Sequence, residues 1–194
     1  MTKFEKKLVD SLDEDYKNLI EKFVGMSAIH VANLAAGYGE DERKTLERIV
    51  RIVELSTQML QVLPGKVAVA SDMPEEQIIK WTPHSETIQI NIKYLKEKDN
   101  IEDARNLMIA VHTAVFMKHV RAFVESTNET VHEYAEKMGW YHEWKNSVDP
   151  LENPKLFFEQ KYVKDALAYG IAYTESALSQ AEKILQDLKE KQNG

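Results

Sequence analysis

Residues 102–125 read EDARNLMIAVHTAVFMKHVRAFVE. Two acidic side chains stand in the first turn of this segment, where they favour the positive end of a helix dipole. From Leu107 onward, apolar side chains fall on almost every side of a helical wheel, and a helix with so little polar surface is normally buried. The segment therefore predicts a central, buried helix against which the rest of the chain packs.

The residues at the N-terminal end predict a helical layer. Apolar residues recur every three or four positions over 3–24, which places them on one face of an amphipathic helix. A short apolar helix is predicted over 26–36, and another is predicted from the cap residue Asp41 to Leu63. The residues expected on the buried face of the first helix are Phe4, Leu8, Leu12, Tyr16, Leu19 and Phe23.

The residue pattern of the sequence changes beyond Leu63. Two short segments, 66–70 and 87–92, are rich in β-branched residues, and the second alternates apolar and polar side chains. Both patterns are typical of strands, the second with one buried face. We therefore expect an α+β fold that is mostly helical, with a small two- or three-stranded sheet beside the central buried helix and an N-terminal helical segment.

Two further helices are predicted beyond the central one. The first, over 128–146, is more polar and ends in a cluster of three aromatic residues. The second, over 155–190, carries a long apolar stripe that begins with Phe158, and Gly170 is a candidate for a bend in it. Both helices extend the mainly helical architecture.

Length and composition limit the class of protein. The chain has 194 residues, of which 43% are apolar, and this suits one domain made of an N-terminal helical layer (1–63) and a core (64–194). A net charge of −7 does not concentrate Lys and Arg for phosphate binding, so we do not expect a nucleic-acid partner. The absence of cysteine excludes disulfides and thiolate chemistry. No signal-like or membrane-length apolar run occurs, so a cytoplasmic location without a membrane contact is expected.

The order of elements from 66 to 175 has a further feature. A strand ends in Ile90-Asn91-Ile92, the buried helix contains His112, and the last helix contains Asp165-Ala166. This order resembles small zinc metallopeptidase-like domains that are common in bacterial, phage and plasmid genomes. In that family the strand displays an Ile-Asn pair, the next helix carries His-Glu-x-x-His, and a later helix supplies a carboxylate ligand beside an Asp-Ala pair.

The resemblance implies a site from which most of the metal ligands have been lost. Such a motif needs two His four residues apart to hold zinc and a Glu between them to activate the bound water. His112 matches the first ligand, but Thr113 stands at the position of the base and Phe116 at that of the second ligand. Val163 stands where the later carboxylate is expected, and Asp165 is retained. We therefore expect no metal, no cofactor and no catalytic residue at these positions.

A displaced metal site is the alternative interpretation of the same residues. His112 would then act with Asp165 or with a residue of the 128–146 helix. His119 is a poor second ligand, because seven residues separate the two histidines by about 10.5 Å along a helix. Otherwise His112 is expected to be a hydrogen-bonded core histidine, and His119, beside Lys118, is expected near the surface.

The sequence leaves three functions open. Trp140, Tyr141 and Trp144 either pack in the core or form a partner-binding patch, since interfaces favour Trp and Tyr. With the ligands lost, the first expectation is a non-catalytic protein-interaction module, a pseudoenzyme such as a phage- or plasmid-borne inhibitor or regulator of a host protein. A metal-dependent peptidase or hydrolase with displaced ligands is the second, and a self-associating helical protein, a homodimer, is the third.

Overall fold

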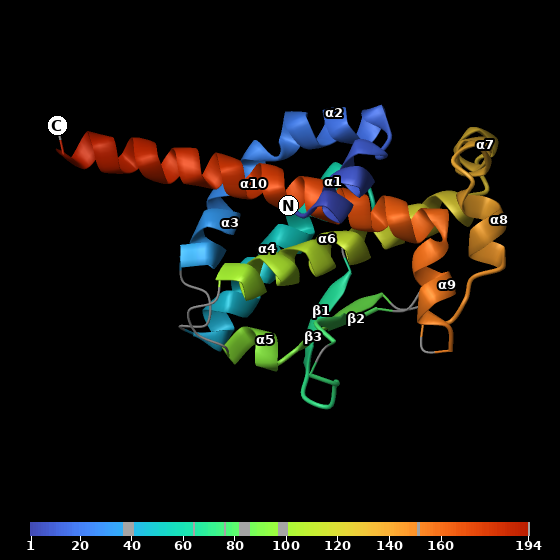
Figure 1. The fold of residues 1–194 in the computed structure, drawn as a ribbon, viewed down its shortest axis with the longest axis horizontal. Helices are drawn as coiled ribbons and strands as arrows, with labels where there is room; N and C mark the ends of the chain where they lie inside the picture. The colour runs from blue at the N-terminus through green and yellow to red at the C-terminus, as the bar shows by residue number, and fades with distance from the viewer. Residues whose placement is uncertain are drawn as a thin grey trace.

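A computed structural model describes residues 1–36, 41–63, 65–75, 77–81, 86–96, 101–150 and 152–193. Two long helices, α6 (Ile101–Val124) and α10 (Lys161–Asn193), cross at the centre of the molecule (Figure 1). Between Leu107 and Val120 the apolar side chains of α6 are buried except for the half-buried Ala110 and Met117, which confirms the central helix that the sequence predicts. The described chain is 71% helical with a small mixed sheet, so the expected α+β class is confirmed.

The N-terminal region forms more helices than the sequence indicates. The predicted helix over 3–24 begins after Thr2, which forms a capping box with Glu5. It is divided at Asp13, which caps a second helix by accepting a hydrogen bond from the Asp15 amide at 2.9 Å. The predicted cap at Asp41 is confirmed, since its side chain accepts from the Lys44 amide. The resulting helices are α1 (Lys3–Asp10), α2 (Glu14–Phe23), α3 (Gly25–Ala36) and α4 (Glu42–Met59).

The sheet has the strand order β1-β3-β2. The two predicted strands, β1 (Lys66–Ala70) and β3 (Thr87–Asn91), pair in parallel, and a two-residue strand that the sequence did not indicate, β2 (Ile79–Lys80), pairs antiparallel with β3. Asn91 fixes the segment that leads to β2, because its side-chain amide donates to the carbonyls of Pro74 and Gln77, each at 2.9 Å. The short helix α5 (Lys93–Lys96) follows directly.

Two interruptions shape the C-terminal half. The predicted helix over 128–146 is divided at Gly139, whose φ of 77° lies in the left-handed region that favours glycine. Gln160 likewise separates a short helix from α10, and α10 then continues as one helix through Gly170. The three short helices are α7 (Glu129–Lys137), α8 (Trp140–Lys145) and α9 (Pro154–Glu159).

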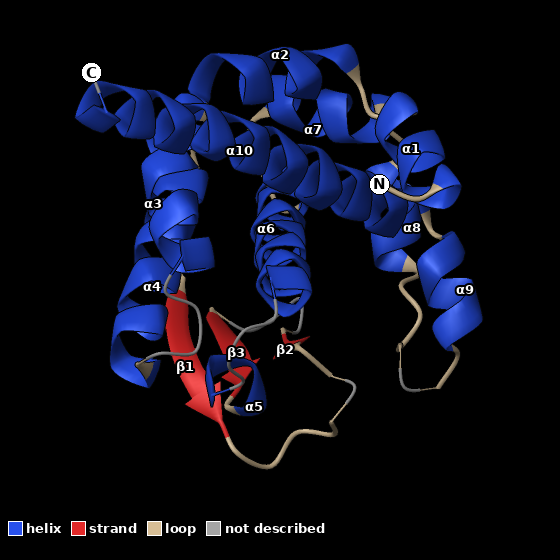
Figure 2. Ribbon diagram, turned by 60° about the vertical axis from the view of Figure 1, so that its left-hand side comes forward, coloured by secondary structure: helices blue, strands red, loops and turns tan. Residues whose placement is uncertain are grey.

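The helices and the sheet share one hydrophobic core, which joins buried residues from Leu8 in α1 to Ala177 in α10. Figure 2 shows α6 between the α3–α4 pair and the C-terminal helices, with the sheet at its lower end. The segment Glu102–Val124 is long and apolar enough to cross a membrane by composition, but 72% of its most apolar window is buried inside the fold. Core helices of this kind have the same composition, so the finding gives little support to a membrane span.

Candidate functional site

His112 lies in the core with none of its surface exposed. Its Nδ1 atom is 3.2 Å from the Ser56 hydroxyl of α4, and its ring packs against Tyr173 of α10 at 4.1 Å between centroids. Burial lowers the pKa of His112 to about 3, so the ring is neutral at physiological pH. Its Nε2 atom has no hydrogen-bond partner in the described part of the chain. The side chain is therefore a hydrogen-bonded core histidine, enclosed by helices.

Thr113 stands at the crossing of α6 and α10. Its hydroxyl donates to the Ile109 carbonyl at 2.7 Å, and it lies directly against Gly170. A Cβ atom at position 170 would come within 2.7 Å of the Ile109 carbonyl oxygen and 3.1 Å of the Thr113 nitrogen. Glycine at this position therefore lets the two helix backbones approach closely.

Phe116 and Val163 are both buried, with 0% and 1% of their surface exposed. The Phe116 ring packs against Tyr16 at 4.9 Å and Tyr169 at 4.7 Å between centroids. Aromatic side chains of α2, α6 and α10 thus surround the position of the second metal ligand. Since none of these groups can coordinate zinc in the way a second histidine does, this face of α6 serves core packing.

Asp165 is buried and positions Trp140. Its Oδ2 atom accepts a hydrogen bond from the indole nitrogen of Trp140 at 2.8 Å and from the Lys161 ammonium at 2.7 Å. The Lys161 ammonium balances the negative charge of Asp165, so this carboxylate does not require a metal cation. Among the described residues, no group of three His, Asp or Glu side chains could hold a metal ion.

His119 is buried, and the expectation that it lies near the surface is wrong. Its Nδ1–H donates to the Leu60 carbonyl at 3.0 Å, so its Nε2 accepts from the Tyr16 hydroxyl at 2.9 Å. Burial lowers its pKa to about 4, although the hydrogen bond to Leu60 opposes this shift. Both partners lie more than 50 residues away in the sequence, so no local pattern indicates that they cover this face of α6.

The aromatic cluster of α8 is divided between core and surface. Trp140 has no exposed surface, so it belongs to the core and cannot be part of a partner-binding patch. Tyr141 and Trp144 are half-buried; the Tyr141 ring packs against His132 and beneath the Lys145 ammonium, and Trp144 packs against Tyr162. Of the three aromatic residues, only Tyr141 and Trp144 therefore expose part of their surface.

We expect Asp165→Ala to lower the free energy of unfolding by about 1.5 kcal/mol, because it leaves the Trp140 N–H unpartnered in the core. In a Trp140→Phe background the same substitution should cost less than half as much, since that N–H is already gone. Urea denaturation of the four proteins measures this coupling, and Glu159→Ala, at an exposed carboxylate of α9, is the control. Equal costs in both backgrounds would show that Asp165 does not position Trp140.

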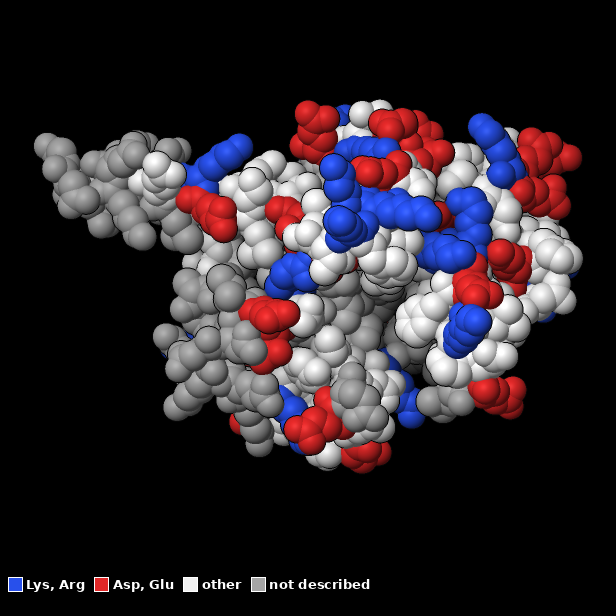
Figure 3. Space-filling model, in the orientation of Figure 1, with Lys and Arg blue, Asp and Glu red and all other residues white. Residues whose placement is uncertain are grey.

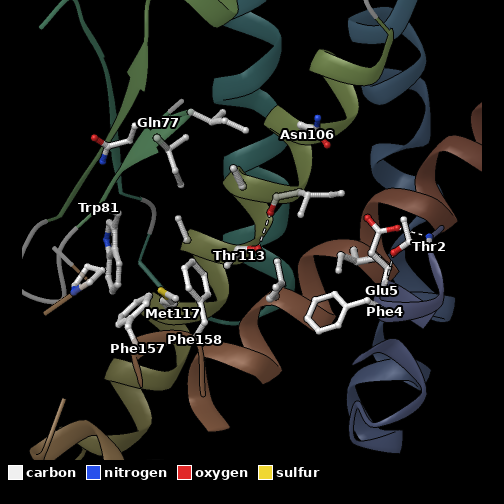
Figure 4. A pocket seen from close by; sticks show the side chains of 18 residues that line it. Thr2, Phe4, Glu5, Gln77, Trp81, Asn106, Thr113, Met117, Phe157 and Phe158 are labelled. Carbon is white, nitrogen blue, oxygen red and sulfur yellow. Dashed lines mark hydrogen bonds between the residues drawn. The ribbon is translucent and has the colours of Figure 1, made fainter. Parts of the chain in front are cut away.

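A groove opens on the other side of α6. It encloses about 660 Å³ between α1, α6, α9, α10 and the segment around β2 (Figure 4). The surface of the groove is mainly apolar. Large side chains that line it include Phe4, Trp81, Met117, Phe157, Phe158 and Ile171.

Two aromatic residues at the groove are exposed, although the sequence places them on buried helix faces. Phe4 has 66% and Phe158 has 56% of its surface exposed. The expectation is wrong for both because α1 and α9 are short helices at the edge of the fold, where part of the apolar face lies over the groove. The sequence signal for this site is weak: Phe4 and Phe158 each stand near the start of a predicted helix, within its apolar stripe.

Glu5 is the only charged residue among the described groove-lining residues. Arg105 forms an ion pair with it and also bridges to α10, with Nη2 at 3.0 Å from the Glu5 carboxylate and Nε at 2.6 Å from Glu175. Burial opposes ionisation of Glu5, but hydrogen bonds from Thr2 and Arg105 hold its pKa below the usual range. The interior of the groove therefore has no unpaired charge among the residues described, and α1 is tied to α6 and α10.

Comparison of the chain with protein-family models, curated proteins and solved structures finds no match. The similarity to zinc metallopeptidase-like domains thus has only the sequence pattern as its basis. The structural features that bear on function are the groove and the enclosed surroundings of His112.

Proposed function

We propose that this protein is a non-catalytic protein-interaction module that receives apolar side chains of a partner in the groove between α1, α6, α9 and α10. The observation that supports this most strongly is the combination of a ligand-sized apolar hollow with exposed Phe4 and Phe158 at it. Binding sites are typically concave and largely apolar, with volumes of about 300–1,000 Å³. Exposed aromatic residues beside such a hollow are typical of interfaces.

The residues at the motif positions support the non-catalytic part of the proposal. A zinc hydrolase needs three protein ligands, an open coordination position and a base near the bound water. Here a neutral imidazole without solvent access, a phenyl ring and an isopropyl group occupy the ligand positions, and the Thr113 hydroxyl is bonded to its own helix. No observation favours a displaced set of ligands in the described chain.

Binding of the apolar dye 1-anilinonaphthalene-8-sulfonate to the native protein tests the groove. We expect Phe4→Asp/Phe158→Asp to weaken dye binding at least tenfold, because both substitutions put charge at an apolar site. Since these side chains are largely exposed, stability should change by no more than about 0.5 kcal/mol per site. A fluorescence titration gives the dye affinity, and a thermal melt confirms that the variant is folded.

Leu156→Asp is the matched control, since Leu156 lies on α9 and is 46% exposed but does not line the groove. Dye binding that is weakened equally by Leu156→Asp, or not weakened by the double variant, would reject the groove as the binding site. Stoichiometric zinc in the purified protein, lost in His112→Ala, would reject the non-catalytic part.

A further inference from the structure

We infer that the partner segment is an acidic amphipathic helix, which lays its apolar face in the groove and its carboxylates against a ring of lysines. This inference depends on the proposed function, because it names the kind of partner for the same site. It is based on three features of the described chain: the lysines beside the groove, the ion pair that occupies Glu5 in its interior and the helices that form its walls.

Three lysines stand one helical turn away from groove-lining residues of their own helices. Residues three apart on a helix lie on the same side of it, so each lysine stands at the edge of the groove. All three are exposed, and none has an ion-pair partner among the residues that the structure describes. The pairs are Lys7 with Phe4 on α1, Lys155 with Phe158 on α9, and Lys164 with Leu167 on α10.

Lysines stand beside the groove although the molecule as a whole is acidic. Figure 3 shows Lys and Arg side chains over α1, α10 and α9 beside a hollow below α10, with Asp and Glu side chains near α9 and across the hollow; the chain as a whole has a net charge of −7. At physiological salt, charges are screened beyond about 8 Å. The lysines next to a bound segment therefore decide which charge it prefers, and carboxylates fit them.

The walls of the groove favour a helix over an extended segment. An added strand would need a free sheet edge of some length, but β2, the strand that borders the groove, has only two residues. The other walls are helices that present large apolar side chains, among them Met117, Phe157 and Ile171. An amphipathic helix offers apolar side chains at positions i, i+3, i+4 and i+7, which suits such a trough.

Two designed 18-residue helical peptides test the inference. Both have leucine at positions i, i+3, i+4 and i+7, and the flanking positions are glutamate in one and lysine in the other. At about 50 mM salt we expect the glutamate peptide to bind at least tenfold more tightly by isothermal titration calorimetry. This advantage should shrink as the salt concentration rises, because the lysines are exposed to solvent.

Charge reversal at the lysine ring gives the decisive comparison. We expect Lys7→Glu/Lys155→Glu/Lys164→Glu to prefer the lysine peptide. The control, Lys44→Glu/Lys137→Glu/Lys183→Glu, makes the same change in net charge at exposed lysines of α4, α7 and the C-terminal half of α10, and it should keep the preference for glutamate. If both triple variants shift the preference equally, net charge and not the ring decides, and the inference is wrong.

Other occupants give distinct outcomes. Equal binding of the two peptides, or no binding of either, overturns the acidic-helix inference; dye binding that still depends on Phe4 and Phe158 then leaves the groove as a binding site. Laurate that binds in the groove while neither peptide does identifies an acyl chain as the occupant. Sedimentation that shows a dimer, dissociated by Phe158→Asp, identifies a second copy of the chain. Either of the last two results also overturns the inference.

Discussion

Gly170→Ala will lower the free energy of unfolding by about 2 kcal/mol. An added methyl group would lie 2.7 Å from the Ile109 carbonyl oxygen, and a backbone atom in the middle of a helix cannot move aside easily. Overpacking of this kind costs about 3 kcal/mol, of which the better helix propensity of alanine returns about 1 kcal/mol. Chemical denaturation monitored by circular dichroism measures the difference, and Gly170→Leu should prevent folding.

Gly25→Ala is the matched control for this substitution. At Gly25 the added carbon would meet only the end of the flexible Gln180 side chain, at 3.2 Å, so stability should change by no more than about 0.5 kcal/mol. Thr113→Ala should recover part of the loss in the Gly170→Ala protein, because it removes the hydroxyl that lies against position 170. A Gly170→Ala protein as stable as the Gly25→Ala protein would show that the two backbones are not in close contact.

Lowering the pH from 7 to 5 will remove about 4 kcal/mol of stability. The unfolded chain binds protons at His112 and His119 near the ordinary pKa of 6.5, whereas burial holds the folded values at about 3 and about 4. Stability is therefore fully present above pH 6.5 and is lost as the pH falls toward the folded values. Each histidine accounts for about 2 kcal/mol of the stability lost by pH 5, because pH 5 lies about 1.5 units below the unfolded pKa and one unit corresponds to about 1.4 kcal/mol.

The slope of stability against pH identifies the source of this loss. His112→Gln and His119→Gln should each reduce the slope between pH 7 and 5 by about half, whatever each does to stability at pH 7. His142, an exposed residue of α8, provides the control, and His142→Gln should leave the slope unchanged. A wild-type protein with equal stability at pH 7 and pH 5 would contradict the burial of both rings.

The parts of the fold that sequence predicts are those that depend on local periodicity. The all-round apolar pattern of residues 102–125 and the alternation of 87–92 lead directly to α6 and β3. The breaks at Asp13 and Gly139 were missed, although an N-cap residue type and a glycine mark them. The apolar repeat continues across both breaks, so the pattern predicts one continuous helix where the structure has two.

The candidate site was less accessible from sequence, because it depends on contacts between distant segments. Nothing near His119 indicates that Tyr16 and Leu60 enclose it, and nothing near Phe158 indicates that α1 lies on the opposite side of a groove. A sequence pattern shows which face of a helix is apolar but not which part of that face another element covers. Trp140 shows the same limit: its burial follows from contacts with Asp165 and with α2 and α6.

Because α10 packs against α1, α2, α3, α6, α8 and α9, these elements complete their core only with a helix that the ribosome makes after all of them. During synthesis, core residues such as Phe116 and Trp140 lack their contacts with Tyr169 and Asp165 of this helix, and exposed apolar surface on a nascent chain promotes aggregation. The native fold is thus reached late in translation. A chain cut before Lys161 would be a substrate for chaperones and proteases.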